Sequence, residues 1–296
     1  MSLLETQREQ TRARYPDEEG YVERDGMRVF YEVYGDGEPT VFLPPPWAIV
    51  HSRIWKMQIP NFARHFRVVV YDGRGNGKSD RPDSAEAYGE REQAADAFAV
   101  LDATGTEQAV VVGFSWGGQW SLILAAEHPE RVTALCFLGA GPGLSREPFP
   151  YEEYPFDEEL GIDEGWAKEN RYYWLRDWPG YVDWFFSQCF TEPHSTKQIE
   201  DAVGWGLETD PETMLLTEGS PVLEPAEVRD LCARLTCPVL VVHGSEDAIV
   251  PYAEAVALAD ATGGRLVIFE GSGHCPQVRD PVRFNLLLRD FVESVA

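Results

Sequence analysis

The chain is 296 residues long and 44% hydrophobic, so it can bury the core of one large domain, with or without an insertion. Its formal net charge of −25 at pH 7 would repel nucleic acid and anionic membrane surfaces, and we expect neither as a partner. No apolar run approaches the roughly 20 residues that cross a membrane, and the first residues lack the apolar core of a signal peptide.

The N-terminal part of the chain predicts a polar arm followed by strands. The first 18 or so residues are polar and charged, which predicts a flexible or loosely packed arm. Runs of β-branched and aromatic residues predict strands over residues 21–24, 27–34, 41–43 and 67–71. The first two of these strands flank Asp25-Gly26, a dipeptide typical of a hairpin turn.

A glycine-rich segment, residues 72–80, follows the last of these strands. It contains a lysine and a serine after Gly77, as phosphate-binding loops do. The spacing of Gly73, Gly75 and Gly77 nevertheless falls short of the pattern G-x-x-x-x-G-K-[ST]. We therefore interpret the segment as a structural turn.

The segment Gly-Phe-Ser-Trp-Gly-Gly, residues 113–118, carries the strongest functional signal. It follows the β-branched run 109–112 and precedes an amphipathic stretch over 119–128. A serine between two glycines at a strand-to-helix turn is typical of a nucleophile elbow, in which the turn holds the serine in a strained conformation. We expect Gly113 and Gly117 to be needed because a Cβ atom would collide where strand and helix meet.

The remaining elements alternate along the chain. Apolar residues at helical spacing predict helices over residues 90–104, 119–128, 252–262 and 281–295. Strands are predicted over residues 134–138 and 265–269 and from Pro238 onward. Such alternation predicts an α/β fold in which a mostly parallel central sheet carries helices on both faces.

Two polar loops follow the last two predicted strands. Asp247 lies just past the strand that begins at Pro238, and His274 lies in the loop after residues 265–269. Ligand sites of open parallel sheets lie at the carboxyl ends of strands. The order Ser115, Asp247, His274 is that of an α/β-hydrolase triad, and the chain resembles this family, in its serine-nucleophile esterase and perhydrolase-like branch, over nearly its whole length.

The alternation lapses between residues 145 and 222, where aromatic residues and carboxylates crowd together. The resemblance implies a helical cap over 145–222, inserted into a hydrolase core made of 1–144 and 223–296. Most of the aromatic side chains are expected to pack the cap onto the core, but aromatic residues also line most small-molecule pockets. We therefore expect a hydrophobic small-molecule substrate. The candidate substrate-binding residues are His51, Trp174, Trp184 and Phe185, with packing or helix capping as the alternative for His51.

The resemblance implies a role for each member of the trio. A serine hydroxyl needs a neighbouring base at neutral pH, so His274 would take the proton of Ser115. Asp247 would hold the imidazole in the required tautomer. The rival acid is Asp72, which also follows a strand but precedes the nucleophile. His243 lies inside a strand and is interpreted as a buried, hydrogen-bonded core residue.

An oxyanion needs two backbone N–H donors. One is expected from Trp116, the residue after the nucleophile. The other normally comes from the loop after the third strand, where many relatives carry His-Gly but this chain has Pro44-Pro45-Pro46-Trp47. Because proline has no N–H, Trp47 supplies the first available donor in that loop.

The identity of the nucleophile limits the classes of reaction that the chain is expected to catalyse. Epoxide hydrolases and haloalkane dehalogenases of this fold use an aspartate at the elbow, so Ser115 argues against both. We expect hydrolysis of a carboxylester, lactone or thioester through an acyl-enzyme. The alternatives are a carbon–carbon bond hydrolase, a cofactor-free perhydrolase or haloperoxidase and, from another class, a hydrolase-like protein that binds a small ligand. A non-catalytic interaction scaffold is a further alternative.

The cysteines and the other potential ligands predict neither a metal nor a cofactor. The five cysteines are odd in number and irregularly spaced, which indicates reduced thiols in a cytoplasmic protein, with neither a disulfide framework nor a zinc site. Oligomeric state has no signal in the sequence.

Overall fold

The computed structural model describes residues 13–295, which form a central eight-stranded sheet. The strand order across the sheet is β1-β2-β4-β3-β5-β6-β7-β8. β2 runs antiparallel to both of its neighbours, and the pairs from β4 to β8 are parallel. The strands are β1 (Glu18–Arg24), β2 (Met27–Tyr34), β3 (Thr40–Leu43), β4 (Arg67–Tyr71), β5 (Ala109–Phe114), β6 (Val132–Leu138), β7 (Val239–Gly244) and β8 (Arg265–Phe269).

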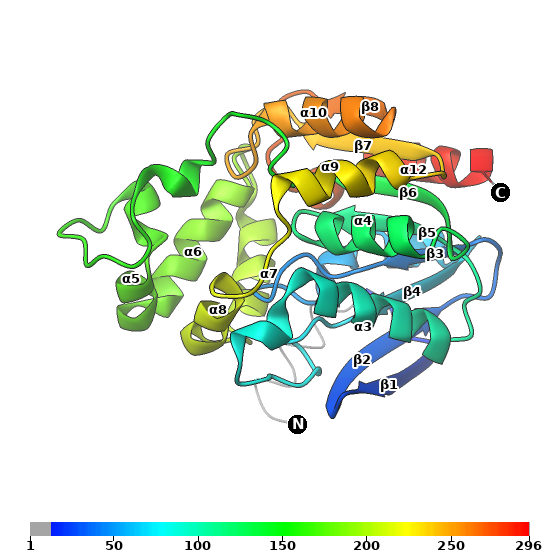
Figure 1. Cartoon of the computed structure of the whole chain (residues 1–296), viewed down its shortest axis with the longest axis horizontal. Helices are drawn as coiled ribbons and strands as arrows, with labels where there is room; N and C mark the ends of the chain where they lie inside the picture. The colour runs from blue at the N-terminus through cyan, green and yellow to red at the C-terminus, as the bar shows by residue number, and fades with distance from the viewer. Residues whose placement is uncertain (1–12, 296) are drawn as a thin grey trace.

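Side chains of each central strand alternate between two hydrophobic cores. In β5, Val110 and Val112 belong to one core, whereas Ala109 and Val111 belong to the other, as the two-residue period of a strand requires. Helices cover both faces, which explains why these strands are continuously apolar. One face carries α3 (Glu90–Ala103), α4 (Gly117–Glu127), α9 (Pro225–Arg234) and α10 (Tyr252–Thr262), and the other carries α2 (Ile59–Phe62) and α12 (Pro281–Val295) (Figure 1).

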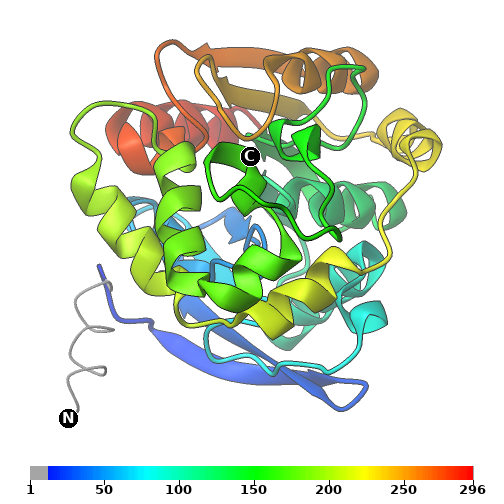
Figure 2. The ribbon, with the colours of Figure 1, turned by 90° about the vertical axis from the view of Figure 1, so that its left-hand side faces the viewer.

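A group of helices lies beyond one end of the sheet, on the left of Figure 1 and toward the viewer in Figure 2. It follows β6 and therefore stands at the carboxyl ends of the parallel strands. Its α-helices are α5 (Arg171–Arg176), α6 (Trp178–Cys189), α7 (Thr196–Gly206) and α8 (Pro211–Glu218). Short 3₁₀ helices over Pro150–Glu153 and Gly165–Lys168 precede them.

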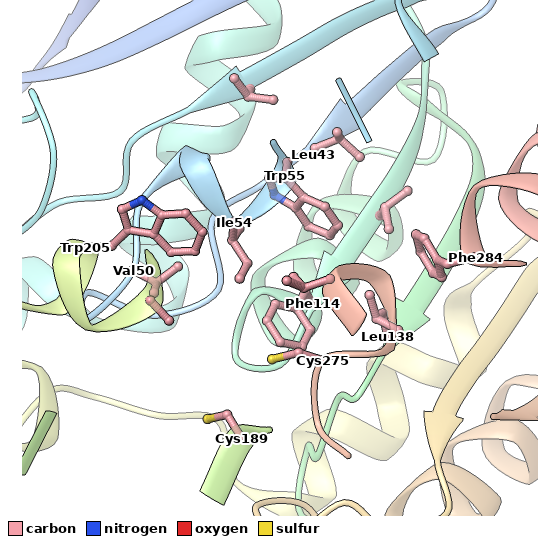
Figure 3. Packing of buried hydrophobic residues seen from close by; sticks show 14 of the residues in the cluster. Leu43, Val50, Ile54, Trp55, Phe114, Leu138, Cys189, Trp205, Cys275 and Phe284 are labelled. Atoms are coloured by element: carbon pink, nitrogen blue, oxygen red, sulfur yellow. The ribbon is translucent and has the colours of Figure 1, made fainter. Parts of the chain in front are cut away.

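The helices beyond the sheet pack onto the core through aromatic rings. Buried Trp174, Tyr181 and Phe186 belong to the same hydrophobic cluster as strand residues of the core. Figure 3 shows part of this cluster, in which Phe114 from β5 lies next to Cys275 and Trp205 from α7 lies near Val50. Residues from both parts of the chain therefore build one continuous hydrophobic cluster.

The observed elements follow the predicted ones closely. The predicted mostly parallel sheet with helices on both faces is confirmed. The hairpin turn has φ of 54° at Asp25 and 79° at Gly26, the positive values of a type I′ turn. The predicted N-terminal arm lies outside the described residues up to residue 12. From residue 13 it is partly wrong, because Arg14 donates to Ala63 O, and β1 begins at Glu18 rather than at 21.

Within residues 13–295, no helix combines the length and apolarity needed to cross a membrane.

Candidate active site

Ser115 occupies a strained turn between β5 and α4. Its φ is 51°, in the left-handed region that non-glycine residues rarely adopt. A Cβ atom on Gly113 would lie 2.7 Å from Gly117 O and 2.8 Å from the Cα of Gly118. The crossing of strand and helix therefore excludes any side chain at Gly113, as the elbow pattern predicts.

The structure brings Ser115, His274 and Asp247 together. His274 Nε2 lies 3.1 Å from Ser115 Oγ, and its Nδ1 lies 2.8 Å from Asp247 Oδ2. The imidazole is buried, with only 3% of the residue exposed, and its amide donates to Cys189 O at 3.1 Å. Each residue follows a different parallel strand, β5, β7 or β8. The sheet therefore brings all three residues together at the carboxyl ends of its strands.

Asp247 is held as a carboxylate. Its Oδ1 accepts hydrogen bonds from the amides of Ile249 at 2.8 Å and Val250 at 3.0 Å. Burial alone would raise the pKa of Asp247, but the adjacent His274 and these hydrogen bonds outweigh it, and the pKa lies below its ordinary value. An ionised Asp247 therefore faces His274 at neutral pH.

A second imidazole stands beside the same carboxylate. His243 is fully buried in β7, with Nε2 3.1 Å from Val250 O and 3.4 Å from Asp247 Oδ2. Burial lowers the pKa of His243, which favours the neutral ring. The interpretation of His243 as a buried, hydrogen-bonded residue agrees with the structure. Sequence analysis missed its contact with Asp247.

The other candidate acid, Asp72, accepts hydrogen bonds from neighbouring loop residues instead. Its Oδ1 accepts from the amide of Ser52 at 3.1 Å and from Ser52 Oγ at 2.6 Å, and its Oδ2 accepts from the amide of Lys78 at 2.9 Å. A Cβ atom on Gly77 would lie 2.3 Å from this carboxylate. The glycine-rich segment is thus a turn folded around Asp72, as its spacing suggests.

Two free backbone amides lie at the elbow. Trp47 and Trp116 both line one cavity together with Ser115, and neither amide donates a hydrogen bond to any of the described residues. The loop that carries Trp47 approaches closely because Gly117 has no side chain, since a Cβ atom there would lie 2.7 Å from Pro45 O. Backbone N–H groups without a hydrogen-bond partner, next to a nucleophile, are the donors that oxyanion holes use.

The cavity beside Ser115 encloses about 110 Å³, and a smaller one of about 30 Å³ adjoins Ser115 and His274. Half of the residues that line the larger cavity are aromatic: Trp47, Trp116, Phe149, Tyr151, Phe156, Trp166 and Phe185. Its polar lining includes Gln119, Glu169 and Glu218. Neither an arginine nor a lysine of the described chain lines it.

Of the four predicted substrate-binding residues, only Phe185 lines these cavities. His51 instead accepts from the amide of Arg53 as the N-cap of a 3₁₀ helix, the alternative left open for it. Trp174 is fully buried behind the wall, with its ring 6.4 Å from that of Trp47. Trp184 stacks edge-on against Trp166 at 5.0 Å. Both tryptophans therefore support the residues that line the cavities, and neither cavity includes them.

The lining glutamates escaped the sequence analysis for a clear reason. The chain has 50 acidic residues, and many of them lie between residues 145 and 222. Glu169 is one of the few acidic residues of this segment that are buried, with 9% exposed, and this depends on how the helices pack.

Family models match two parts of the chain. Residues 39–172 match the model described as the alpha/beta hydrolase fold, and residues 205–281 match the model described as TAP-like protein. The matches include the elbow in the first part, and Asp247 and His274 in the second.

Individual relatives cover most of the chain. A 2-hydroxymuconate semialdehyde hydrolase of Pseudomonas sp. (strain CF600) is 31% identical over 241 residues, covering 80% of each protein. A pimeloyl-(acyl-carrier protein) methyl ester esterase of Yersinia enterocolitica is 26% identical over 271 residues, covering 90% of this chain and 98% of the relative. The solved structure of Est816, described as an N-acyl homoserine lactone degrading enzyme, has 30% identity and a TM-score of 0.73, and the match covers 92% of this chain and 100% of that one.

Proposed function

The chain belongs to the α/β-hydrolase fold family and is a hydrolase, and from this premise we propose that it cleaves carboxylic esters, including lactones or thioesters, with Ser115 as nucleophile. The observation that carries the proposal is the chain of hydrogen bonds from Ser115 Oγ through His274 to Asp247 at the wall of a cavity. The segment 145–222 acts in this proposal as a cap that covers the nucleophile and contributes its aromatic wall.

The proposed reaction has two stages. In the first, Ser115 Oγ attacks the ester carbonyl carbon while His274 Nε2 takes the hydroxyl proton. The amides of Trp47 and Trp116 hold the oxyanion, and its collapse breaks the carbon–oxygen bond while His274 returns the proton to the leaving alcohol. In the second stage, water attacks the acyl-enzyme, His274 takes the proton of the water, and Ser115 recovers it as the acid leaves.

The wall of the cavity supports a mainly hydrophobic substrate. Its seven aromatic residues offer large apolar surfaces next to the nucleophile. A substrate whose reactive end reaches Ser115 would bury its apolar part against rings from both the core, as at Trp47, and the cap, as at Phe185.

A panel of p-nitrophenyl esters of increasing acyl length tests the proposal. We expect turnover of the short members and stoichiometric labelling of the protein by a fluorophosphonate probe. Absence of both turnover and labelling, with ligand binding still detectable by a shift in melting temperature, would favour the alternative of a ligand-binding protein. Labelling by the probe without turnover of any ester would favour the alternatives of carbon–carbon bond hydrolysis or perhydrolysis.

The oxyanion assignment makes a separate prediction at Trp47. Trp47→Pro removes the backbone N–H, and we expect kcat to fall by about 10²- to 10³-fold, the usual loss for one oxyanion donor. Trp47→Phe is the matched control because it keeps the amide and an aromatic ring. Its kcat should change much less than that of Trp47→Pro. Equal kcat values for the two variants, measured on p-nitrophenyl acetate, would show that this amide holds no oxyanion.

A further inference from the structure

Glu169 is a buried residue in the cavity wall, and only one of its two carboxyl oxygens accepts a hydrogen bond from a described residue. Its Oε2 accepts a hydrogen bond from Tyr181 Oη at 2.8 Å, and no described residue donates to Oε1. Burial raises the pKa of Tyr181 far above its ordinary value, so the phenol stays protonated and is the donor of this bond. Glu169 is only 9% exposed, and its Oε1 is available to bind a ligand in the cavity.

Glu218 lines the same cavity as the last residue of α8. Glu218 is exposed at the surface as well as lining the cavity, and the protein around its carboxyl group raises its pKa to about 7 through desolvation. The carboxyl end of a helix carries a partial negative charge, which makes a second negative charge there unfavourable and a cation favourable. Among residues 13–295, no lysine, arginine or histidine forms an ion pair with Glu169 or Glu218.

The groups around the two glutamates supply no positive charge. Burial, and then the charge of Glu218, raise the pKa of Glu169 to about 8. Tyr151 and Tyr181 face the pair as neutral phenols, because burial raises the pKa of both. The neighbouring Lys168 is directed elsewhere, with its ammonium 5.4 Å from the ring centre of Tyr173.

We propose that Glu169 and Glu218 select esters that carry a protonated amine, which binds between the two carboxylates and the aromatic faces of the cavity. This inference deepens the proposed function and rests on it. An ammonium can donate charge-assisted hydrogen bonds to the free carboxylate oxygens, and the electron-rich faces of rings such as Trp166 and Tyr151 attract cations. An anionic substrate would meet two acids and no cationic partner, so it is selected against.

Competitive inhibition distinguishes the classes of ligand without assuming which side of the ester carries the amine. Hexylammonium, 1-hexanol and hexanoate have similar sizes and differ in the charge of the head group. With hydrolysis of p-nitrophenyl acetate as the readout, we expect hexylammonium to bind at least tenfold more tightly than hexanol, and hexanoate to bind most weakly.

The variants assign this preference to the two glutamates. Glu169→Gln and Glu218→Gln keep the shape of the side chain and remove its charge, and each should reduce the preference for hexylammonium over hexanol severalfold. Glu212→Gln, at the exposed start of α8, is the matched control and should retain the full preference. Melting temperatures verify that each variant is folded.

The pH dependence gives an independent readout. Both carboxyls lose their protons as pH rises through about 7 and about 8, whereas an alkylammonium keeps its own proton until about pH 10. Affinity for hexylammonium should therefore increase between pH 6 and pH 9, while affinity for hexanol stays constant. Equal affinities for hexylammonium and hexanol across this range, or an unchanged preference in both glutamine variants, would overturn the inference.

Calorimetry on the Ser115→Ala variant separates this inference from the proposed function, because it measures binding without turnover. An ammonium preference in that variant, combined with no ester hydrolysis by the unaltered protein, would refute the proposed reaction and leave the cation site standing. Hydrolysis without any ammonium preference would refute the cation site alone.

Discussion

Ser115→Ala is expected to reduce kcat for p-nitrophenyl acetate on the order of 10⁶-fold, the loss seen when a nucleophile of this type is removed. The reason is that His274 would have no hydroxyl to deprotonate and no acyl-enzyme would form. Steady-state kinetics and labelling by a fluorophosphonate both measure the effect, and both signals should disappear.

A second serine provides the control for this substitution. Ser294 lies in α12, its Oγ donates to Phe291 O, and it lines neither of the two cavities beside Ser115. Ser294→Ala should hydrolyse the same ester at the rate of the unaltered protein. If Ser115→Ala kept its activity, or if the probe labelled another residue, the assignment of the nucleophile would be wrong.

The sheet could be predicted from sequence because each strand is short, apolar and bounded by turn residues. The run 67–71 was predicted with the observed bounds, since residues on both faces of a central strand are buried and the apolar run Val68–Tyr71 is continuous. β1 was less predictable. It lies at the edge of the sheet with an exposed, charged face, so Glu18 and Glu19 carry no strand signal although they pair with β2.

The catalytic candidates were predictable for a related reason. Ser115, Asp247 and His274 each follow a strong strand signal, and parallel strands align their carboxyl ends without any knowledge of long-range packing. The cavity wall had no such guide. Phe185 lines the cavity and Trp184, its neighbour in α6, does not, because the Trp184 ring packs against Trp166 and against Tyr181 of its own helix.

Trp47 connects the sheet and its helices with the segment 145–222. Its ring lies 5.8 Å from that of Phe185 and 6.4 Å from that of Trp174, both in that segment. Trp47 also lines the cavity, and it follows three prolines in the chain. The packing of the segment 145–222 against the Trp47 ring therefore contributes to the shape of the cavity. This explains why the buried Trp174, although it lines nothing, belongs to the architecture of the site.

Asp247→Asn is expected to lower kcat by about 10⁴-fold through the wrong imidazole tautomer. The amides of Ile249 and Val250 both donate to Oδ1, so the asparagine oxygen must take that position. Its NH₂ group then occupies the place of Oδ2 and faces His274 Nδ1, which must become an acceptor. The ring proton consequently moves to Nε2, where it points at Ser115, and His274 can no longer accept the hydroxyl proton.

The rival acid supplies the control for this last substitution. Asp72→Asn disturbs acceptors used by Ser52 and Lys78, so it should lower the melting temperature while leaving kcat within a few-fold of its original value. Asp247→Asn should show the opposite pattern, with a large loss of kcat in a folded protein. A folded Asp72→Asn variant without activity, beside an active Asp247→Asn variant, would reverse the assignment, because the imidazole of His274 would then take its orientation from a different carboxylate.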